Sequence, residues 1–307
     1  MYIASNETLQ NSGEIISCMP REIRKYLFGI NMSEAYEIRL RTGRPVMIYF
    51  PDGCYYLSRH GMLTQDVSSA VRVTKAQITE AIEIASKSSV YSVAEEIRDG
   101  YITLNGGNRM GICGSAVLEN GKITFLKDIS ALNYRIACEI SGASDKIADK
   151  VITSDGVKNT LIISPPGAGK TTMLRDLIRR ISEEGYNVSV IDERREIAAV
   201  HEGKPSFDLG AFTDVLSGAP KAEGMLMALR SMAPEVIATD EIGHSSDAEA
   251  IEKIINSGVK VIATIHGKNL EQVRERSELA GAMQFFETFI VLSRRCGAGT
   301  VEEVRAK

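Results

Sequence analysis

Paired cysteines, long apolar runs and an excess of positive charge are all missing from this chain of 307 residues. The five cysteines are scattered and include no C-x-x-C pair, a pattern typical of reduced thiols and not of a disulfide framework or a zinc site. No apolar run reaches the roughly 18 residues that a membrane-spanning helix needs, and the N-terminal segment lacks the apolar core of a signal peptide. We therefore expect a cytoplasmic protein without a transmembrane segment, whose contact with a membrane is at most peripheral.

The formal net charge of −4 argues against an extended surface for nucleic acid, while leaving room for local basic patches. With 44% hydrophobic and 25% charged residues, the composition is that of a globular protein. The length corresponds to about two domains, because a typical domain holds about 100–200 residues. Residues 141–155 are rich in turn formers and give the expected boundary, which divides the chain into residues 1–140 and 141–307.

The second half is dominated by LIISPPGAGKTT, residues 161–172, which reads as an apolar strand, a loop of proline and glycine, and the start of a helix. Such a loop exposes successive backbone N–H groups, and the helix start adds a partial positive charge, so both favour bound phosphate. We expect Lys170 to reach the β- and γ-phosphates of a nucleotide, and the Thr171 hydroxyl to ligate Mg²⁺. The expected nucleotide-binding residues are Pro166, Gly167, Ala168, Gly169, Lys170, Thr171 and Thr172.

Single residues of this phosphate loop, and a motif that the chain lacks, bear on which nucleotide it binds and how. Gly167 and Gly169 are expected because a Cβ at either position would obstruct the approach of phosphate to the backbone. Ser164 departs from the usual motif, which has a glycine six residues before the lysine. No N/T-K-x-D motif for reading guanine is present, so ATP is favoured over GTP.

Residues 236–241, VIATDE, form an apolar strand that ends in two adjacent carboxylates, the expected partner of a phosphate loop. Asp240 is expected to hold Mg²⁺ through water, because this hard ion keeps part of its hydration shell. Glu241 is expected to orient or deprotonate the attacking water. Two uncompensated carboxylates at the end of a buried strand would be unfavourable, so a metal ion gives an electrostatic reason for them.

Two more strand ends carry polar residues. Residues 187–192 form a strand followed by a charged cluster that contains Glu193, and ligands bind beyond the carboxyl ends of strands in an open parallel sheet. The alternative for this cluster is a plain salt-bridged loop. Residues 260–265 form a strand that we expect beside the phosphate-loop strand. Thr264 and the following His266 would then sense the γ-phosphate, although a lone histidine is also compatible with a structural role.

The other segments of the second half predict further helices and one further strand. Helical spacing of apolar residues indicates helices at residues 169–184, 221–232 and 246–257, and a charged amphipathic helix at residues 269–280. A last strand is expected at residues 289–292. Residues 207–220 are polar, contain glycine and have no assignment.

The first half has the pattern of an α+β domain without an internal repeat. Ile38 and Leu40 alternate with charged residues as in a half-buried strand, which places Arg39 and Arg41 on the opposite face. That face is either solvated or a contact for a subunit or a phosphate. Strands at residues 46–50 and 54–57 flank a Pro-Asp-Gly turn.

Further along, residues 74–77 form a capping box that opens a helix, and a second helix is expected near residues 90–99. The glycine-dense residues 105–111 are interpreted as tight turns, because no helix follows them as it would in a second nucleotide loop. Asn120-Gly121 predicts a β-hairpin.

Several stretches resemble the stage III sporulation protein AA family, bacterial ATPases similar to the motor ATPases of type II and type IV secretion systems. The resemblance covers nearly the whole chain and rests on EIRLRTGRP and GYITLNGGNRMGICG in the first half, and on SPPGAGKTT, VIDERREIA, PEVIATDEIG and VIATIHG in the second. It implies that Asp192 and Glu193 match the aspartate box of the secretion ATPases, Glu241 their catalytic glutamate, and His266 their histidine box. Asp240 departs from the pattern, since those enzymes often have glycine there.

The resemblance implies an α/β fold, with a RecA-like P-loop NTPase core of parallel sheet and flanking helices, and a smaller N-terminal α+β domain. It also implies an ATPase that uses Mg²⁺ and acts as a hexameric ring, energising a channel between mother cell and forespore through membrane channel components. Direct binding of nucleic acid is not expected. Transition-state charge in such a ring also needs an arginine, often from a neighbour; the candidates are Arg194, Arg195, Arg98, Arg109 and Arg135.

Three rival functions remain open at this point. The first is a nucleic-acid-stimulated P-loop ATPase, a loader or translocase, favoured by the Arg39 and Arg41 face and disfavoured by the acidic balance. The second is a scaffold that binds nucleotide as a switch and hardly turns it over. The third is a small-molecule kinase, for which the sequence offers no acceptor pocket.

Overall fold

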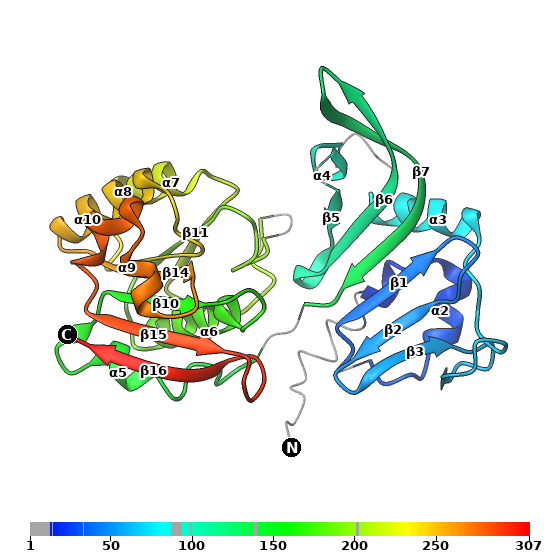
Figure 1. Cartoon of the computed structure of the whole chain (residues 1–307), viewed down its shortest axis with the longest axis horizontal. Helices are drawn as coiled ribbons and strands as arrows, with labels where there is room; N and C mark the ends of the chain where they lie inside the picture. Colours follow the sequence, from blue (N-terminus) through cyan, green and yellow to red (C-terminus); the bar gives the residue numbers. More distant parts are fainter. Residues whose placement is uncertain are drawn as a thin grey trace. The chain divides into compact units, whose positions relative to one another are not determined.

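The computed structural model describes residues 13, 15–32, 34–86, 94–98, 100–137, 140–200 and 203–307. The chain divides into two compact units, Met1–Glu139 and Ile140–Lys307, each with a seven-stranded sheet of its own (Figure 1). The helix expected near residues 90–99 lies partly outside the described residues, and its described part is α4 (Ala94–Arg98). Among the described residues, no helix is both long and apolar enough to cross a bilayer.

The first unit contains an antiparallel sheet in the order β4-β3-β2-β1-β7-β6-β5. Its strands are β1 (Glu37–Arg41), β2 (Met47–Phe50), β3 (Gly53–Leu57), β4 (Leu63–Thr64), β5 (Tyr101–Thr103), β6 (Arg109–Glu119) and β7 (Lys122–Arg135). Ile38 and Leu40 are fully buried, as the alternation in β1 predicts. The expected hairpin is confirmed, because Asn120 and Gly121 join β6 to β7 with positive φ angles.

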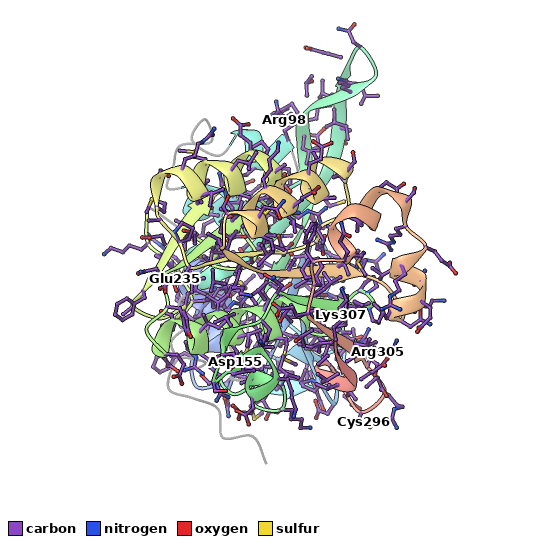
Figure 2. The ribbon with its side chains drawn as sticks, turned by 90° about the vertical axis from the view of Figure 1, so that its left-hand side faces the viewer. Arg98, Asp155, Glu235, Cys296, Arg305 and Lys307 are labelled. Atoms are coloured by element: carbon purple, nitrogen blue, oxygen red, sulfur yellow. The ribbon has the colours of Figure 1, made fainter. Side chains whose placement is uncertain are left out.

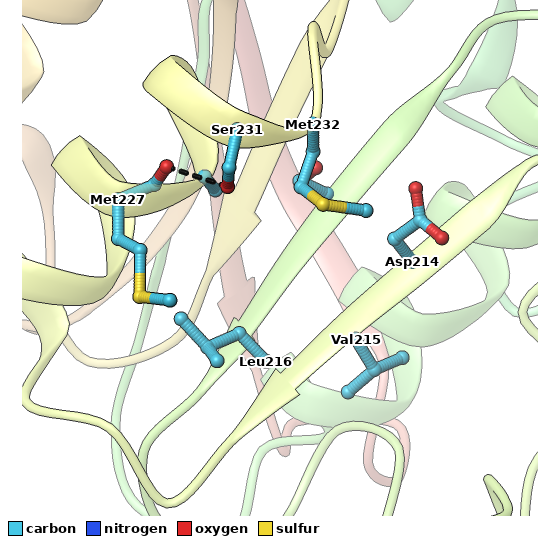
Figure 3. Close-up of a pocket in the computed structure, with 8 residues that line it drawn as sticks. Asp214, Val215, Leu216, Met227, Ser231 and Met232 are labelled. Carbon is cyan, nitrogen blue, oxygen red and sulfur yellow. Dashed lines mark hydrogen bonds between the residues drawn. The ribbon is translucent and has the colours of Figure 1, made fainter.

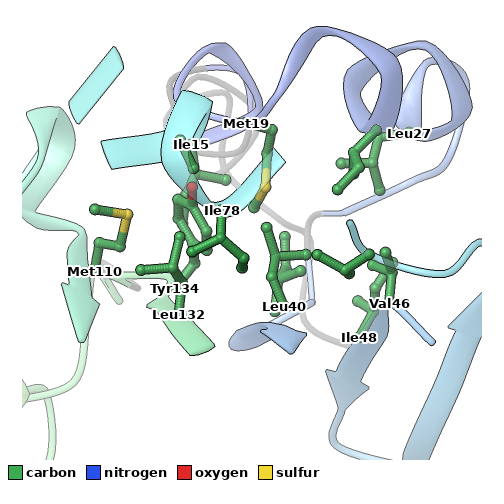
Figure 4. Packing of buried hydrophobic residues seen from close by; sticks show 14 of the residues in the cluster. Ile15, Met19, Leu27, Leu40, Val46, Ile48, Ile78, Met110, Leu132 and Tyr134 are labelled. Carbon is green, nitrogen blue, oxygen red and sulfur yellow. The ribbon is translucent and has the colours of Figure 1, made fainter. Parts of the chain in front are cut away.

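Helices cover one face of this sheet. Buried side chains of α2 (Arg21–Leu27) and α3 (Lys75–Ala85) pack on the inward residues of β1, β2 and β7 (Figure 4). The capping box before α3 is confirmed, since the backbone N–H of Gln77 donates to Thr74 Oγ1 at 3.2 Å and the Gln77 side chain accepts the N–H of Thr74 at 2.9 Å. The glycine-dense segment forms the short 3₁₀ turn η2 (Asn105–Gly107) between β5 and β6.

The second unit contains a sheet in the order β12-β11-β13-β14-β10-β15-β16. All neighbours are parallel except β15 and β16. The strands are β10 (Thr160–Ser164), β11 (Val188–Asp192), β12 (Thr213–Ser217), β13 (Val236–Thr239), β14 (Lys260–His266), β15 (Thr288–Ser293) and β16 (Thr300–Ala306). A short segment of α5 (Ala148–Val151), β8 (Ile152–Thr153) and β9 (Gly156–Val157) precedes them. The phosphate-loop strand β10 therefore lies beside β14, as expected.

Helices pack on both faces of this parallel sheet, because successive residues of each strand point to opposite sides. Leu161 and Ile163 join the core formed with α7 (Lys221–Ser231) and α8 (Ser245–Asn256). Ile162 joins the core formed with α6 (Lys170–Glu183) on the other side. The result is a helix–sheet–helix sandwich with all five residues of β10 buried (Figure 1).

The single helix expected at residues 269–280 is wrong. The segment contains α9 (Leu270–Arg274), the 3₁₀ turn η3 (Ser277–Leu279) and α10 (Ala280–Met283). Leu270 and Leu279 are both fully buried. In one continuous helix they would point in directions about 180° apart, at about 100° per residue. The break allows both side chains to reach the same core.

The strand at residues 289–292 is not the last one. β16 pairs with β15, and the register shifts between Val291 and Leu292. This irregularity removes the strict alternation by which an edge strand is recognised in a sequence. The unassigned residues 207–220 contain another edge strand, β12, whose Asp214 is exposed.

Candidate functional site

The phosphate loop connects the buried strand β10 to the 14-residue helix α6. Gly169 is the N-cap of α6 and has a left-handed backbone, with φ of 86°. Gly167 also has a positive φ, of 69°. The loop therefore presents the start of a long helix at the carboxyl edge of a parallel sheet, where anions bind readily.

The structure gives Gly169 a second reason to lack a side chain. A Cβ on this residue would lie 2.9 Å from the backbone nitrogen of Gly299, in the loop between β15 and β16. At Gly167 the nearest atom to such a Cβ would be Nη1 of Arg294, at 3.6 Å. The residues that follow β15 thus pack directly on the phosphate loop.

Glu241 is the centre of the polar site. Its carboxylate forms ion pairs with Lys170 at the start of α6 and with Arg194 in the loop after β11. Nε2 of His266, at the end of β14, lies 3.0 Å from Oε1 of the same carboxylate. The fold thus brings together three of the predicted site residues, which are Lys170, Glu241 and His266.

The backbone of Glu241 is held in an unfavourable conformation. Its φ of 44° lies in the left-handed region, which costs a non-glycine residue about 1–3 kcal/mol. Its N–H donates to Thr264 Oγ1 at 2.9 Å, and its carbonyl oxygen accepts from Nζ of Lys221 at 3.0 Å. These two contacts fix the peptide units on both sides of Glu241, and so they fix the direction of its carboxylate.

Opposing influences act on the pKa of Glu241. Burial alone raises it, because the side chain is only 11% exposed. The hydrogen bond and charge of Lys170, together with the charges of Arg194 and His266, outweigh burial and hold the pKa below its usual range. Glu241 is therefore an anion, able to accept a hydrogen bond from a water molecule and so to orient it.

Asp240 has the opposite surroundings. Its side chain is fully buried, and neither carboxylate oxygen finds a hydrogen-bond partner among the residues that the structure describes. Burial raises its pKa to about 6; the charge of Lys221 opposes this rise, and the carboxylates of Asp192, Glu196 and Glu241 add to it. Two unpartnered buried oxygens fit a role in holding a hydrated cation.

Within the described part of the chain, no three His, Cys, Asp or Glu side chains form a ready metal cluster. A magnesium ion at this edge would thus draw on Asp240, on Thr171 at the start of α6, and on oxygens of nucleotide and water. Such a ligand set suits Mg²⁺, which retains several waters and takes substrate phosphates as ligands. The residues present therefore fit the ion.

The charged cluster after β11 divides into two roles. Asp192 is fully buried and accepts the backbone N–H groups of Glu196, Ile197 and Ala198 at 2.7–3.0 Å, so it shapes the loop. Glu193 instead points to Lys221, with 3.3 Å between its Oε2 and Nζ. Glu193 thus contacts the site through Lys221 and not through Glu241.

Lys221 belongs to the site, although the sequence pattern assigns it no role beyond the start of a helix. It is only 6% exposed, begins α7, and contacts Glu193 and the carbonyl oxygen of Glu241. Its position in the sequence is a signal for a nearby anion, because the helix dipole disfavours a lysine in the first turn of a helix unless an anion is near. Arg294 was likewise unassigned, since the contact of its strand end with the phosphate loop requires the three-dimensional fold.

A separate pocket lies away from these residues. It holds about 110 Å³ between β12 and α7, and its lining is mostly apolar (Figure 3). The lining residues are Ser189, Asp214, Val215, Leu216, Met227, Ala228, Ser231 and Met232. None of them belongs to the phosphate loop or contacts Glu241, so this pocket is not part of the candidate site.

Known structures share this fold. The pilus retraction motor PilT with bound ADP gives a TM-score of 0.56 at 15% identity, over 88% of this chain and 76% of that one. The ATPase DotB of Legionella pneumophila gives 0.54 at 16% identity, over 84% of this chain and 72% of that one. Identities this low concern the fold alone. They confirm the expected RecA-like P-loop core with a smaller N-terminal α+β domain.

Sequence comparison is more specific. The family model described as "Sporulation stage III, protein AA" matches residues 9–307. The stage III sporulation protein AA of Bacillus subtilis (strain 168) is 35% identical over 304 residues, which cover 96% of this chain and 95% of that protein. On the extent of both matches, the chain belongs to the sporulation stage III, protein AA family.

Proposed function

We propose that this protein is a magnesium-dependent ATPase. The observation that carries the proposal is the convergence of Lys170, from the phosphate loop, and His266, from the end of β14, on the carboxylate of Glu241. A lysine at a phosphate loop, facing an acid that follows a parallel strand two places away in the sheet, is the arrangement that aligns a nucleotide phosphate with a water molecule. The names of the structural neighbours, a retraction motor and an ATPase, agree with this function.

Catalysis at this site is positioning combined with electrostatic stabilisation. The loop amides from Pro166 to Thr172 and the ammonium group of Lys170 hold the phosphates. Bound triphosphate competes with Glu241 for Lys170, which releases the carboxylate to orient the attacking water. Mg²⁺, held by Asp240 and Thr171, supplies charge neutralisation for the phosphate oxygens when it is bound.

Two other predicted residues support Glu241. His266 donates from Nε2 to the Glu241 carboxylate and keeps it aimed at the loop when Lys170 turns to phosphate. Glu193 balances the buried charge of Lys221, which in turn holds the carbonyl oxygen of Glu241. Neither residue needs to touch the nucleotide to affect turnover.

The cellular role follows from the family. We propose a cytoplasmic motor of sporulation that assembles as a hexameric ring and energises a channel between mother cell and forespore through membrane channel components. The name of the Bacillus subtilis relative supports a place in sporulation, and the name of the PilT neighbour supports a motor. Nucleotide at subunit boundaries would allow each ring position to respond to its neighbour.

Two substitutions test the activity. Lys170→Ala should abolish nucleotide binding, because it removes the cation that faces phosphate. Glu241→Gln should bind ATP with Mg²⁺ and hydrolyse it at least about 100-fold more slowly, in the range expected for loss of a catalytic base. Calorimetry reports binding, and phosphate release reports turnover. Unchanged turnover in Glu241→Gln would remove this residue from the proposed role.

A second function has one observation in its favour. The sheet face opposite the helices of the first unit has a cavity of about 340 Å³ whose lining includes Arg39, Arg41 and Asn133. Arg39 also lies over the ring of Tyr49, at 5.4 Å from its centre. Basic and aromatic side chains together suit single-stranded nucleic acid. A salt-dependent gel shift with single-stranded DNA, together with stimulated hydrolysis, would favour a nucleic-acid-stimulated ATPase.

A further inference from the structure

The loop between β15 and β16, residues 294–299, is attached to the phosphate loop. The backbone N–H of Gly299 donates to the carbonyl oxygen of Ala168 at 2.9 Å. The two segments are packed closely enough that a Cβ on Gly169 would lie 2.9 Å from the nitrogen of Gly299. Figure 2 labels Cys296 in this loop, at the end of the β15–β16 hairpin. The hairpin loop is thus a fixed neighbour of the expected nucleotide position.

Arg294 occupies a particular place in this hairpin loop. Its Nη1 atom is 3.6 Å from where a Cβ of Gly167 would stand, so its guanidinium group lies over the phosphate loop. Its side chain is exposed and makes no ion pair or hydrogen bond with any residue that the structure describes. The next residue, Arg295, is by contrast engaged by Glu302, with distances of 3.0 Å and 3.2 Å. One of two adjacent arginines is therefore paired, and the other faces the phosphate loop.

The strand order says which part of a nucleotide Arg294 would meet. β10 lies between β14 and β15. His266, which contacts Glu241, ends the strand on one side of the loop, whereas Arg294 follows the strand on the other side. The acid that orients water marks the γ-phosphate side, so Arg294 faces the phosphates that ADP and ATP have in common.

We propose that Arg294 is a nucleotide-binding residue that contacts the α- or β-phosphate from the β15 side of the phosphate loop, within the same chain. The inference rests on the proposed function and adds a cation that the phosphate-loop motif does not include. A guanidinium group suits this role because its planar fork of N–H donors matches phosphate oxygens. Gly167 leaves the space between the guanidinium group and the loop open for those oxygens.

The test is calorimetric titration of the full chain with ADP and with a non-hydrolysable ATP analogue, both with Mg²⁺. Arg294→Ala should weaken the binding of both nucleotides by a similar factor, about 10- to 100-fold, as expected for loss of a charge-assisted hydrogen bond. Arg294→Lys should recover part of the affinity, because it retains the charge without the fork. Arg295→Ala is the matched control and should bind like the unmodified chain, because its partner is Glu302.

The outcomes separate this inference from the function on which it rests. If the unmodified chain binds both nucleotides and Arg294→Ala binds them equally well, Arg294 is a solvated surface residue and the inference is overturned, while the ATPase proposal stands. If only the ATP analogue is weakened, the assignment to the shared phosphates is wrong. If the unmodified chain binds neither nucleotide, both proposals fall.

Discussion

Asp240 and Glu241 are adjacent carboxylates with opposite electrostatic surroundings. Glu241 has cations on its carboxylate, and its pKa is lowered in spite of burial. Asp240 is fully buried with unpartnered oxygens, and its pKa is raised to about 6. This difference assigns the two acids different roles, since one stays charged without a ligand and the other is stabilised as an anion only by a cation.

The raised pKa of Asp240 predicts a stability effect. A group with a raised folded-state pKa stabilises the fold fully below its ordinary pKa, and this contribution is lost as the pH rises through about 6. In the metal- and nucleotide-free protein at pH 7.5, Asp240→Asn should therefore be more stable than the unmodified chain, by up to about 3 kcal/mol. Denaturant unfolding at pH 7.5 and at pH 5 measures this, and the advantage should shrink at the lower pH. An advantage that is the same at both values would contradict the raised pKa.

Asp176 predicts the opposite pH dependence. Its buried carboxylate accepts from the backbone N–H groups of Gly142 and Ser144, from the Ser144 hydroxyl, and from Arg179. Burial raises its pKa, but these bonds outweigh burial and lower it. Its stabilising contribution is present above the ordinary carboxylate pKa and is lost as the pH falls below it.

We therefore expect Asp176→Asn to cost about 1–3 kcal/mol of unfolding free energy at pH 7, and less as the pH falls below about 4. The control is Glu183→Gln, which removes the more exposed partner of the same Arg179 and should change stability by less than about 0.5 kcal/mol. Chemical unfolding across this pH range compares the two variants. Equal costs for both would show that the buried contacts of Asp176 are not what matters.

At the scale of the element, α7 contains a glycine, Gly224, that is explained by packing against the sheet and not by helix propensity. A Cβ on Gly224 would lie 2.8 Å from Cγ2 of Ile191 and 3.3 Å from Cδ2 of Leu216, on the strands below. Gly224→Ala gains about 1 kcal/mol of helix propensity but forces a packed contact that typically costs about 1–3 kcal/mol. We expect net destabilisation. In α10, no atom of the residues that the structure describes lies within 4 Å of such a Cβ on Gly281, so Gly281→Ala should stabilise. Thermal melts of both variants measure this; a stabilising Gly224→Ala would show that α7 can move away from the sheet.

Elements with a strong local pattern could be predicted from the sequence. The buried strands that carry the phosphate loop and Asp240 have unbroken apolar runs, and α6 presents its apolar residues on one face. The edge strands β12 and β16 could not be recognised in the same way, because polar residues and a register shift interrupt their pattern. The single helix expected at residues 269–280 failed for another reason, since burial of both Leu270 and Leu279 requires a break.

In the candidate site, too, only residues that belong to a local sequence pattern could be predicted. Lys170, Glu241 and His266 belong to short motifs at strand ends, and parallel pairing of β10, β13 and β14 brings such ends together. The role of Lys221 depends on how α7 packs against the sheet. The role of Arg294 depends on the packing of the β15–β16 hairpin loop, which is far from the phosphate loop in the sequence. Contacts of this kind are set by tertiary packing, so no local sequence pattern reports them.

At the scale of the whole molecule, each unit has a separate core. Among the described residues, the core of the first unit is formed by residues from that unit, and the two cores of the second unit flank its parallel sheet. Lys170, Asp240, Glu241 and His266 all belong to the second unit. The expected arginine candidates Arg98, Arg109 and Arg135 belong to the first. The proposed ring would allow such an arginine to come from another copy of the chain, since the arginine that stabilises transition-state charge acts either in cis or in trans.

This arrangement predicts assembly that depends on nucleotide. A ligand that binds better to the assembled form shifts the equilibrium toward it. Sedimentation of the full chain should therefore show a larger species when Mg²⁺ and a non-hydrolysable ATP analogue are present than when they are absent. Lys170→Ala, which should not bind the analogue, is the control and should sediment alike in both conditions. A chain that stays monomeric under all conditions, while calorimetry shows bound nucleotide, would refute the ring and leave an ATPase that acts alone.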